Sequence, residues 1–224
     1  MRAMIASWPS PSGGEEYALS IDAGRKGRLL ILTPLFDEAN KTRHTLVETM
    51  RRLDGAGIDS FLPDLHGCNE SLAPLEEQTL ASWRAAATAA AAHFGATHLL
   101  TVRASAILAP PALPGWRYAP TGGANILRAM LRARTIAARE AWVSETSESL
   151  MEIGREEGLE LAGYRLGAAM IRDLEAARLP DSGRLVDLGQ PTIGGPAPWL
   201  RAEPGYSPAQ ADMLAAFLTM GMSL

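Results

Sequence analysis

Four of the residues best suited to chemistry lie together in the loop that follows Pro63. Asp64, His66, Cys68 and Asn69 fall within six consecutive positions, and they could supply a general base, a thiol nucleophile and hydrogen-bonding groups. A cysteine and a histidine two positions apart on one loop, however, point their side chains in poorly matched directions. The competing interpretation is a structural loop in which Asp64 caps neighbouring amides.

Ser105 is a second candidate nucleophile, because a serine hydroxyl can attack a carbonyl when a histidine accepts its proton. The chain has four histidines, His44, His66, His93 and His98, and none after position 98. No histidine therefore follows Ser105 to act as its base. His44 and His93 are expected on helix surfaces and His98 at a strand edge. No histidine pair has zinc-ligand spacing with further ligands, so neither a metal nor another cofactor is expected.

A set of basic side chains could bind an anion. Guanidinium groups hold phosphates bidentately, so the set predicts a pocket for a phosphate or sugar phosphate if its members converge. The competing interpretation is a solvated helix face. The set consists of Lys41, Arg103, Arg128, Arg132 and Arg134.

Composition limits the class of protein that carries these residues. The 224 residues include 21 Lys and Arg against 25 Asp and Glu, and the net charge of −4 argues against nucleic-acid binding through a basic surface. With 47% hydrophobic residues, the chain can bury a sizeable core. The lone Cys68 excludes an intramolecular disulfide. No apolar run is long enough for a signal peptide or a membrane span, so a cytoplasmic protein is expected.

Strand and helix patterns alternate through the first half of the chain. The runs at 28–34 and 97–102 are continuously apolar, which is typical of strands buried on both faces of a parallel sheet. Helices are expected at 38–53 and 75–94, with a short strand at 60–63 between them. This alternation predicts an α/β fold with three layers and a doubly wound, mostly parallel sheet.

The second half is less regular but extends the same domain. Helices are expected at 125–139, 166–178 and 208–220, and strands at 116–118 and 184–189, while 159–164 is expected to return to the sheet. The whole chain is interpreted as one domain, 1–224. Residues 1–16 are interpreted as a flexible lead-in and 121–158 as a cap-like helical insertion.

Four segments carry a resemblance to a known family. They read LTPLFDEANKTR at 32–43, DLHGCNES at 64–71, PTGGANILRAMLRAR at 120–134 and LAGY at 161–164. In their order and spacing they resemble the exosortase A system-associated hydrolases, most closely the second type. The resemblance implies an α/β-hydrolase fold and a bacterial cytoplasmic protein linked to exopolysaccharide and protein-sorting systems.

The resemblance also indicates where a nucleophile would stand. Active α/β hydrolases place it on a strained strand-to-helix turn with the pattern G-x-S-x-G. The matching segment after the strand at 97–102 reads TVRAS, so Arg103 occupies the nucleophile position and Thr101 and Ser105 replace the glycines. An arginine stays protonated and cannot attack a carbonyl. The helix after this turn is expected to be short, because only residues 104–109 precede two prolines.

The sequence is compatible with two functions. The leading hypothesis is a degenerate α/β-hydrolase-fold protein without a Ser-His-Asp triad, which has an accessory or binding role in an exopolysaccharide or exosortase-associated system. Its ligand would be a small molecule such as a sugar phosphate or a lipid-linked intermediate, and it could form a homodimer or pair with a paralogous hydrolase. The alternative is an ester or thioester hydrolase that uses Asp64, His66, Cys68 and Ser105.

Overall fold

The computed structural model describes residues 4–181 and 183–222. In this part of the chain, a seven-stranded sheet consists of β1 (Met4–Pro9), β2 (Glu15–Ile21), β3 (Arg28–Leu32), β4 (Asp59–Pro63), β5 (His98–Val102), β6 (Gly115–Tyr118) and β9 (Leu185–Leu188). Their order is β1-β2-β4-β3-β5-β6-β9. The five strands from β4 to β9 run parallel, β2 pairs antiparallel with β4, and β1 pairs antiparallel with β2. The predicted mostly parallel sheet is confirmed.

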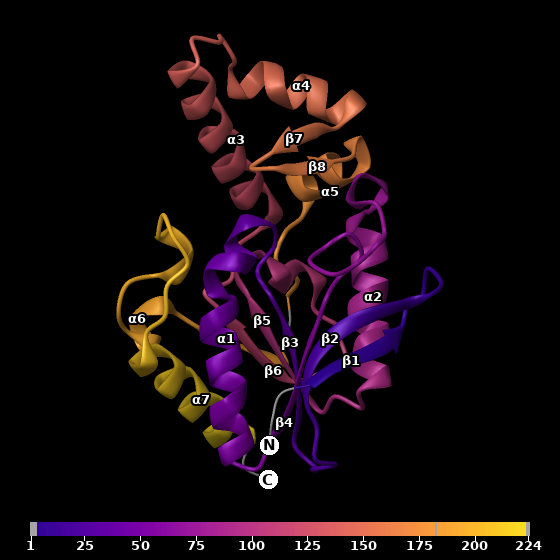
Figure 1. Cartoon of the computed structure of the whole chain (residues 1–224), viewed down its shortest axis with the longest axis vertical. Helices are drawn as coiled ribbons and strands as arrows, with labels where there is room; N and C mark the ends of the chain where they lie inside the picture. Colours follow the sequence, from indigo (N-terminus) through magenta and orange to yellow (C-terminus); the bar gives the residue numbers. More distant parts are fainter. Residues whose placement is uncertain (1–3, 182, 223–224) are drawn as a thin grey trace.

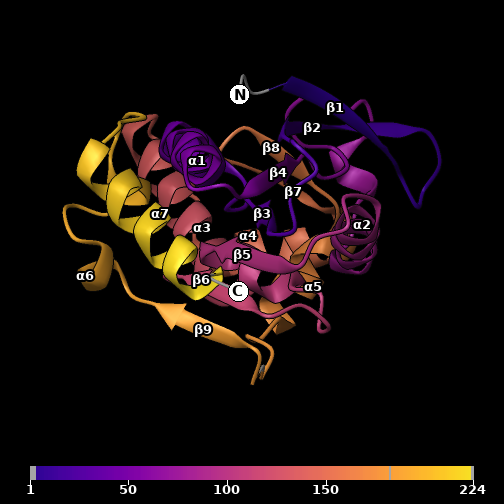
Figure 2. The ribbon, with the colours of Figure 1, turned by 90° about the horizontal axis from the view of Figure 1, so that it is seen from below.

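Helices cover both faces of this sheet. The longer ones are α1 (Asp37–Gly55), α2 (Leu80–His93), α3 (Gly123–Glu140), α4 (Ser147–Glu157), α5 (Ala168–Ala176) and α7 (Pro208–Met222). The short ones are η1 (Leu75–Glu77), η2 (Arg103–Leu108), α6 (Gln190–Ile193) and η3 (Pro198–Leu200). Seen from below in Figure 2, α1 and α7 lie on one side of the sheet and α2 on the other. The predicted three layers are therefore present.

The central strand β3 shows why its sequence is continuously apolar. Leu29 and Ile31 pack into the core beneath α1 and α7, whereas Leu30 and Leu32 pack into the core beneath α2. Successive side chains of a strand point to opposite faces, so both faces must be apolar when both are covered. The run at 28–34 therefore gave a correct prediction of a fully buried strand.

The N-terminal segment, which was expected to be a flexible lead-in, contains a strand of the sheet. Residues 4–9 of the expected span 1–16 form β1, which pairs with β2 from Met4 opposite Ser20 to Pro9 opposite Glu15. The physical reason is Trp8, whose side chain is fully buried against α2 and whose indole N–H donates to Tyr17 O at 3.3 Å. Residues 1–3 of the expected lead-in lie outside the described residues.

A group of elements from α3 to α5 lies beyond the carboxyl ends of the parallel strands, at the top of Figure 1. It includes a separate two-stranded sheet of β7 (Leu159–Leu161) and β8 (Tyr164–Leu166). The expectation that 159–164 returns to the main sheet is therefore wrong. The short run cannot be distinguished by sequence from a strand of the larger sheet. None of the described helices is both long and apolar enough to cross a bilayer.

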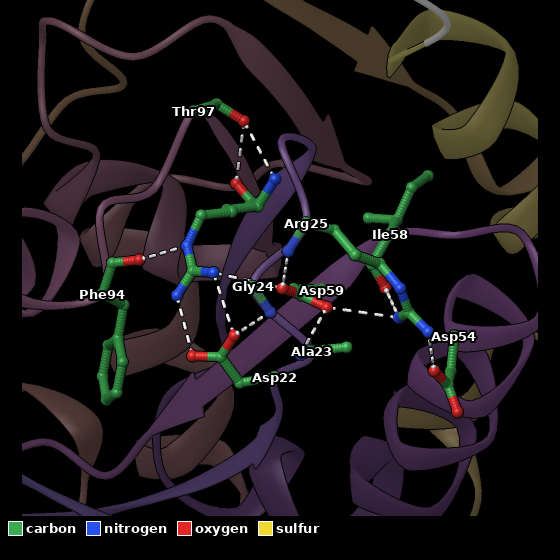
Figure 3. A network of polar contacts seen from close by, with 10 residues as sticks. Asp22, Ala23, Gly24, Arg25, Asp54, Ile58, Asp59, Phe94 and Thr97 are labelled. Atoms are coloured by element: carbon green, nitrogen blue, oxygen red, sulfur yellow. Dashed lines mark hydrogen bonds and ion pairs between the residues drawn. The ribbon is translucent and has the colours of Figure 1, made fainter. Parts of the chain in front are cut away.

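At the opposite end of the sheet, the amino ends of β3 and β4 carry a network of polar contacts (Figure 3). Asp59 is completely buried and accepts hydrogen bonds from the backbone N–H groups of Ala23 at 3.0 Å and Arg25 at 2.8 Å. It also forms ion pairs with the guanidinium groups of Arg25 at 3.2 Å and Arg28 at 3.1 Å. Arg28 in turn forms a bidentate pair with Asp22. These contacts fix the turn between β2 and β3.

Candidate functional site

The turn between β5 and η2 has a strained backbone. Arg103 follows β5 directly and has a φ angle of 58°, in the left-handed region that non-glycine residues seldom adopt. Arg103 therefore lies on a strained turn directly after a strand, which is the kind of backbone position that the resemblance in sequence assigned to it. The following η2 is a six-residue 3-10 helix, so the expected shortening of this helix is also present.

The Arg103 side chain is held by three groups at the carboxyl ends of the strands. Its Nε and Nη2 donate to the two carboxylate oxygens of Glu38 at 3.1 and 3.2 Å, and its Nη1 donates to Ala119 O at 3.0 Å. Its guanidinium also lies over the Trp199 ring, 4.5 Å from the centroid. These contacts fix the Arg103 side chain at the carboxyl ends of the parallel strands.

Glu38 is the acidic partner in this ion pair and is almost fully buried. Burial raises the pKa of Glu38 above its usual value, and the hydrogen bond from Arg103 acts in the opposite direction. A buried carboxylate is costly unless it is paired and hydrogen-bonded. Glu38 and Arg103 are therefore mutually dependent, although they lie 65 positions apart in the chain.

Ser105 is placed as a structural residue. It is completely buried, and its hydroxyl accepts from the N–H of Val102 at 2.9 Å. The same hydroxyl lies 2.9 Å from the carbonyl oxygens of Leu32 and Val102, to which it can donate. Ser105 therefore joins the ends of β3 and β5, and its oxygen has neither the exposure nor the histidine partner that nucleophilic attack requires.

Cys68 and Asp64 are also constrained by burial. Burial, together with the nearby charge of Asp64, raises the pKa of the Cys68 thiol to about 12, so very little thiolate is present at neutral pH. Asp64 accepts from Asn69 Nδ2 at 2.7 Å and lies 3.5 Å from a guanidinium nitrogen of Arg43. Burial raises the pKa of Asp64 as well. The arrangement matches the structural interpretation of this loop.

His66 has a serine partner that the sequence did not indicate. Its Nε2 lies 2.6 Å from Ser10 Oγ, and its ring stacks on Trp8 with 6.2 Å between the centroids. The other nitrogen, Nδ1, is buried and has no hydrogen-bond partner among the described residues. Nδ1 is unpaired in either neutral tautomer, as a donor or as an acceptor, and an unsatisfied buried polar atom costs about 1–3 kcal/mol. Nε2 also lies 3.3 Å from Ser12 Oγ, and no described carboxylate bonds to Nδ1 to orient the ring as a general base.

The signal that could have indicated Ser10 is weak. It stands in the polar turn WPSPSGG between β1 and β2, 56 positions before His66. Only the pairing of β1, β2 and β4 brings this turn beside the loop after β4. A contact that depends on sheet order in this way leaves no local pattern in the sequence.

A small cavity lies between the loops after β3 and β4 and the start of β8. Its volume is about 60 Å³, which is room for only a few water molecules. Phe36 and Tyr164 meet edge to face beside it, with 5.6 Å between their ring centroids. Its lining also includes Pro34, Leu65 and Cys68. The elements above the sheet thus leave little space for a substrate at this point.

The five basic residues of the predicted anion site do not form one cluster. Lys41 and Arg103 both act on the charge of Glu38, but the other three are carried by α3. Most have partners of their own, which are Asp37 for Lys41, Glu38 for Arg103, Asn125 for Arg128 and Glu145 for Arg134. Arg132 is exposed. The solvated helix face is the better description of the α3 residues.

The remaining histidines lie away from the turn at Arg103. Their ring partners are Tyr206 for His44, Phe94 for His93 and Trp116 for His98. Within residues 4–181 and 183–222, no group of three or more His, Cys, Asp and Glu side chains is placed to hold a metal ion. No Ser-His-acid arrangement is present around Arg103 in this part of the chain.

Comparison with known proteins identifies the fold. The sequence matches no family model and no curated protein. The structure is similar to the α/β hydrolase GrgF from a Penicillium species, with a TM-score of 0.50 and 13% sequence identity over 79% of this chain and 73% of that chain. It is also similar to alpha/beta hydrolase domain-containing protein 10 from mouse, with a TM-score of 0.48 and 14% identity over 77% and 69% of the two chains.

A third similar structure is a proline iminopeptidase-related protein from Thermus thermophilus, with a TM-score of 0.46 and 19% identity over 70% of this chain and 57% of that one. The chain spans less than two thirds of the length of several of the structures it matches. The mostly parallel sheet, its helical layers and the similarity to GrgF show that the chain has the α/β-hydrolase fold.

Proposed function

We propose that this chain is a non-catalytic α/β-hydrolase-fold protein with an accessory or binding role in an exopolysaccharide or exosortase-associated system. The observation that carries the proposal is Arg103, which stands in the nucleophile position and is held there by Glu38 and Trp199. An arginine cannot be the nucleophile, and its ion pair occupies the space in front of the turn. The link to exopolysaccharide or protein sorting rests on the resemblance of residues 32–43, 64–71, 120–134 and 161–164.

The elements from α3 to β8 are proposed to act as a cap over the carboxyl ends of the strands. This proposal covers the segment 121–158 and adds the β7–β8 hairpin, because Tyr164 contacts Phe36 beside the small cavity. A ligand that reached this place would have to displace the cap. The protein is accordingly proposed to be cytoplasmic and to bind a small molecule such as a sugar phosphate, without a cofactor.

The alternative, an ester or thioester hydrolase, is less well supported by the geometry. Ser105 is buried and bonded on both sides, and the Cys68 thiol remains protonated at neutral pH. His66 contacts Ser10 rather than either of these groups. An active enzyme built from these residues would need a rearrangement of the loop after β4.

Activity measurements test the proposal directly. The purified chain is assayed with p-nitrophenyl acetate and butyrate and with a thioester substrate, and is then labelled with a fluorophosphonate probe. We expect no turnover above the buffer rate and no labelled residue. Turnover that disappears in Cys68→Ala, Ser105→Ala or Ser10→Ala would overturn the proposal and identify the nucleophile.

A matched variant tests whether a nucleophile at position 103 is the only group that the site lacks, or whether its base is lacking too. Arg103→Ser places a hydroxyl on the strained turn without supplying a histidine. We expect this variant to remain inactive, because no histidine adjoins position 103 in the described residues, and Glu38 alone does not complete a Ser-His-acid arrangement. The binding role is tested by thermal-shift measurements with sugar phosphates, where a complete lack of stabilisation counts against a ligand of this class.

A further inference from the structure

The hairpin of α3 and α4, residues 123–157, exposes an unusual amount of apolar surface. Trp142, in the connection between the two helices, is 97% exposed, and Val143 beside it is 53% exposed. Ile136 on α3 and Ile153 on α4 are each about half exposed. Single exposed apolar residues are ordinary, but several on one hairpin indicate a surface that contacts a partner. Figure 1 shows this hairpin at the end of the molecule farthest from the termini.

The exposed face of α3 is basic. Arg128, Arg132 and Arg139 are exposed and are spaced by four and seven residues, which places them on one face of the helix. None of these three arginines forms an ion pair with another described residue, whereas Arg134 on the same helix is paired with Glu145. The face therefore carries three charges that lack a carboxylate partner within the described chain.

The exposed face of α4 is acidic. Glu148, Glu152 and Glu156 are exposed and follow one another at intervals of four residues, so they form a row along the helix. None of the three forms an ion pair within the described residues, while Arg155 between them is paired with Glu175. The two helices of one hairpin thus offer opposite charges to a partner.

A groove that could accept a bulky side chain lies between α3, the end of α4 and the β7–β8 hairpin. Its volume is about 670 Å³, and its lining combines apolar residues such as Ala133, Ala137 and Ile153 with the charged residues Arg134, Glu157, Glu160 and Arg165. Tryptophan in a pocket of this kind is a common centre of binding energy at protein interfaces. The Trp142 indole of another molecule would meet the apolar side chains of the groove with its ring face and the charged ones with its edge and N–H.

From these features we infer that the α3–α4 hairpin is an interface for a second copy of this chain. In a two-fold arrangement, the basic face of α3 lies against the acidic face of α4 from the partner, and the reverse contact forms on the other side of the axis. A surface that carries both signs is complementary to itself. A lipid surface or another polyanion would be attracted by α3 but repelled by α4. The inference is independent of the proposed function, because it uses no residue of the turn at Arg103.

Sedimentation velocity at several protein and salt concentrations tests the interface. We expect a monomer–dimer equilibrium at micromolar concentrations, with a dissociation constant that rises by more than tenfold when the salt is raised from 50 to 500 mM, since surface charges are screened. Trp142→Ser is expected to weaken the dimer by a similar factor. A wild-type chain that stays monomeric at several hundred micromolar in low salt would overturn the inference.

A charge exchange tests which helices meet. Arg132→Glu/Arg139→Glu and Glu152→Lys/Glu156→Lys are each expected to be monomeric, because like charges then face each other across both halves of the contact. An equimolar mixture of the two variants is expected to dimerise again, since both halves regain opposite charges. A mixture that stays monomeric would contradict the pairing of α3 with α4.

A matched control reverses the same number of charges elsewhere. Lys26→Glu/Arg51→Glu changes two exposed cations outside the hairpin and should dimerise as the wild type does. Circular dichroism of each variant checks that the helices are retained. If the wild type is monomeric and instead sediments with phosphatidylglycerol vesicles but not with phosphatidylcholine vesicles, the surface is one for lipid and the inference is wrong.

Discussion

The two ends of the central sheet both contain arginine–carboxylate pairs, but they use them differently. At the amino ends of β3 and β4, Asp59 accepts from two backbone N–H groups as well as from Arg25 and Arg28 (Figure 3). At the carboxyl ends, Glu38 is bonded to the Arg103 side chain. The first arrangement is part of the backbone structure of a turn, and the second is a contact between two side chains.

The difference shows which end of the sheet can change without loss of the fold. A carboxylate that satisfies backbone donors cannot be replaced without leaving those donors unpaired. A pair of side chains can be replaced together by apolar groups at little cost. The carboxyl end, where α/β proteins hold their ligands, is therefore the end where this chain can lose or acquire chemistry.

The largest effect is expected from Asp59→Asn. Asp59 is fully buried, and its loss of charge leaves two guanidinium groups without their shared partner, so the free energy of unfolding should fall by about 3–5 kcal/mol. Urea denaturation measures this change. Asp22→Asn is the matched control, and because Asp22 is more exposed, it should cost about 1 kcal/mol or less. An equal loss of unfolding free energy in Asp59→Asn and Asp22→Asn would contradict the view that the buried Asp59 holds this end of the sheet together.

The reactivity of Cys68 distinguishes the carboxyl end from an active site. Burial raises the pKa of this thiol from 9.0 to about 12, so its thiolate fraction near pH 7–8 is lower by about 1,000-fold. We expect its reaction with a disulfide reagent such as DTNB to be slower by about this factor in the folded chain than in urea. Rapid reaction of the native protein would indicate an accessible and activated thiol.

The Arg103–Glu38 pair should show a smaller and reversible effect. Arg103→Met leaves Glu38 buried without its partner and should lower the free energy of unfolding by about 2 kcal/mol. The double variant Arg103→Met/Glu38→Gln should recover more than half of that loss. A double-mutant cycle in urea measures the coupling, and additive losses would show that the two side chains do not depend on each other.

The smallest effect concerns His66 and pH. Burial lowers the pKa of His66 below its usual value, although the nearby Glu16 carboxylate acts in the opposite direction. Just below the ordinary pKa of histidine, the unfolded chain therefore binds more protons than the folded one, and stability should rise with pH across this window. His66→Gln should reduce the slope of the unfolding free energy against pH between 5 and 7. His98→Gln should reduce this slope as well, because burial also lowers the pKa of His98.

Local patterns were sufficient to predict the parallel core. The apolar runs at 28–34 and 97–102 correspond to β3 and β5, and the helix expected at 125–139 corresponds to α3. The short helix after β5 was also predicted, because two prolines follow residues 104–109. These features depend on neighbours in the sequence.

The partners of Arg103 and His66 could not be predicted in this way. Glu38 and Trp199 lie far before and far after Arg103 in the sequence. Ser10 meets His66 only because the sheet places β1 and β4 on the two sides of β2. The strand β1 was mistaken for a flexible segment, because its polar and proline-rich surroundings outweighed the alternation that buries Trp8. Each of these contacts is set by tertiary packing.

The left-handed turn at Arg103 is one of three along the same edge of the sheet. Phe36 after β3 and Ala119 after β6 also have left-handed φ angles, of 56° and 46°. Three such turns along one edge are held by the strands and helices that they connect, not by the side chain at any one position. The backbone of this edge can therefore keep its shape whatever side chain stands at position 103.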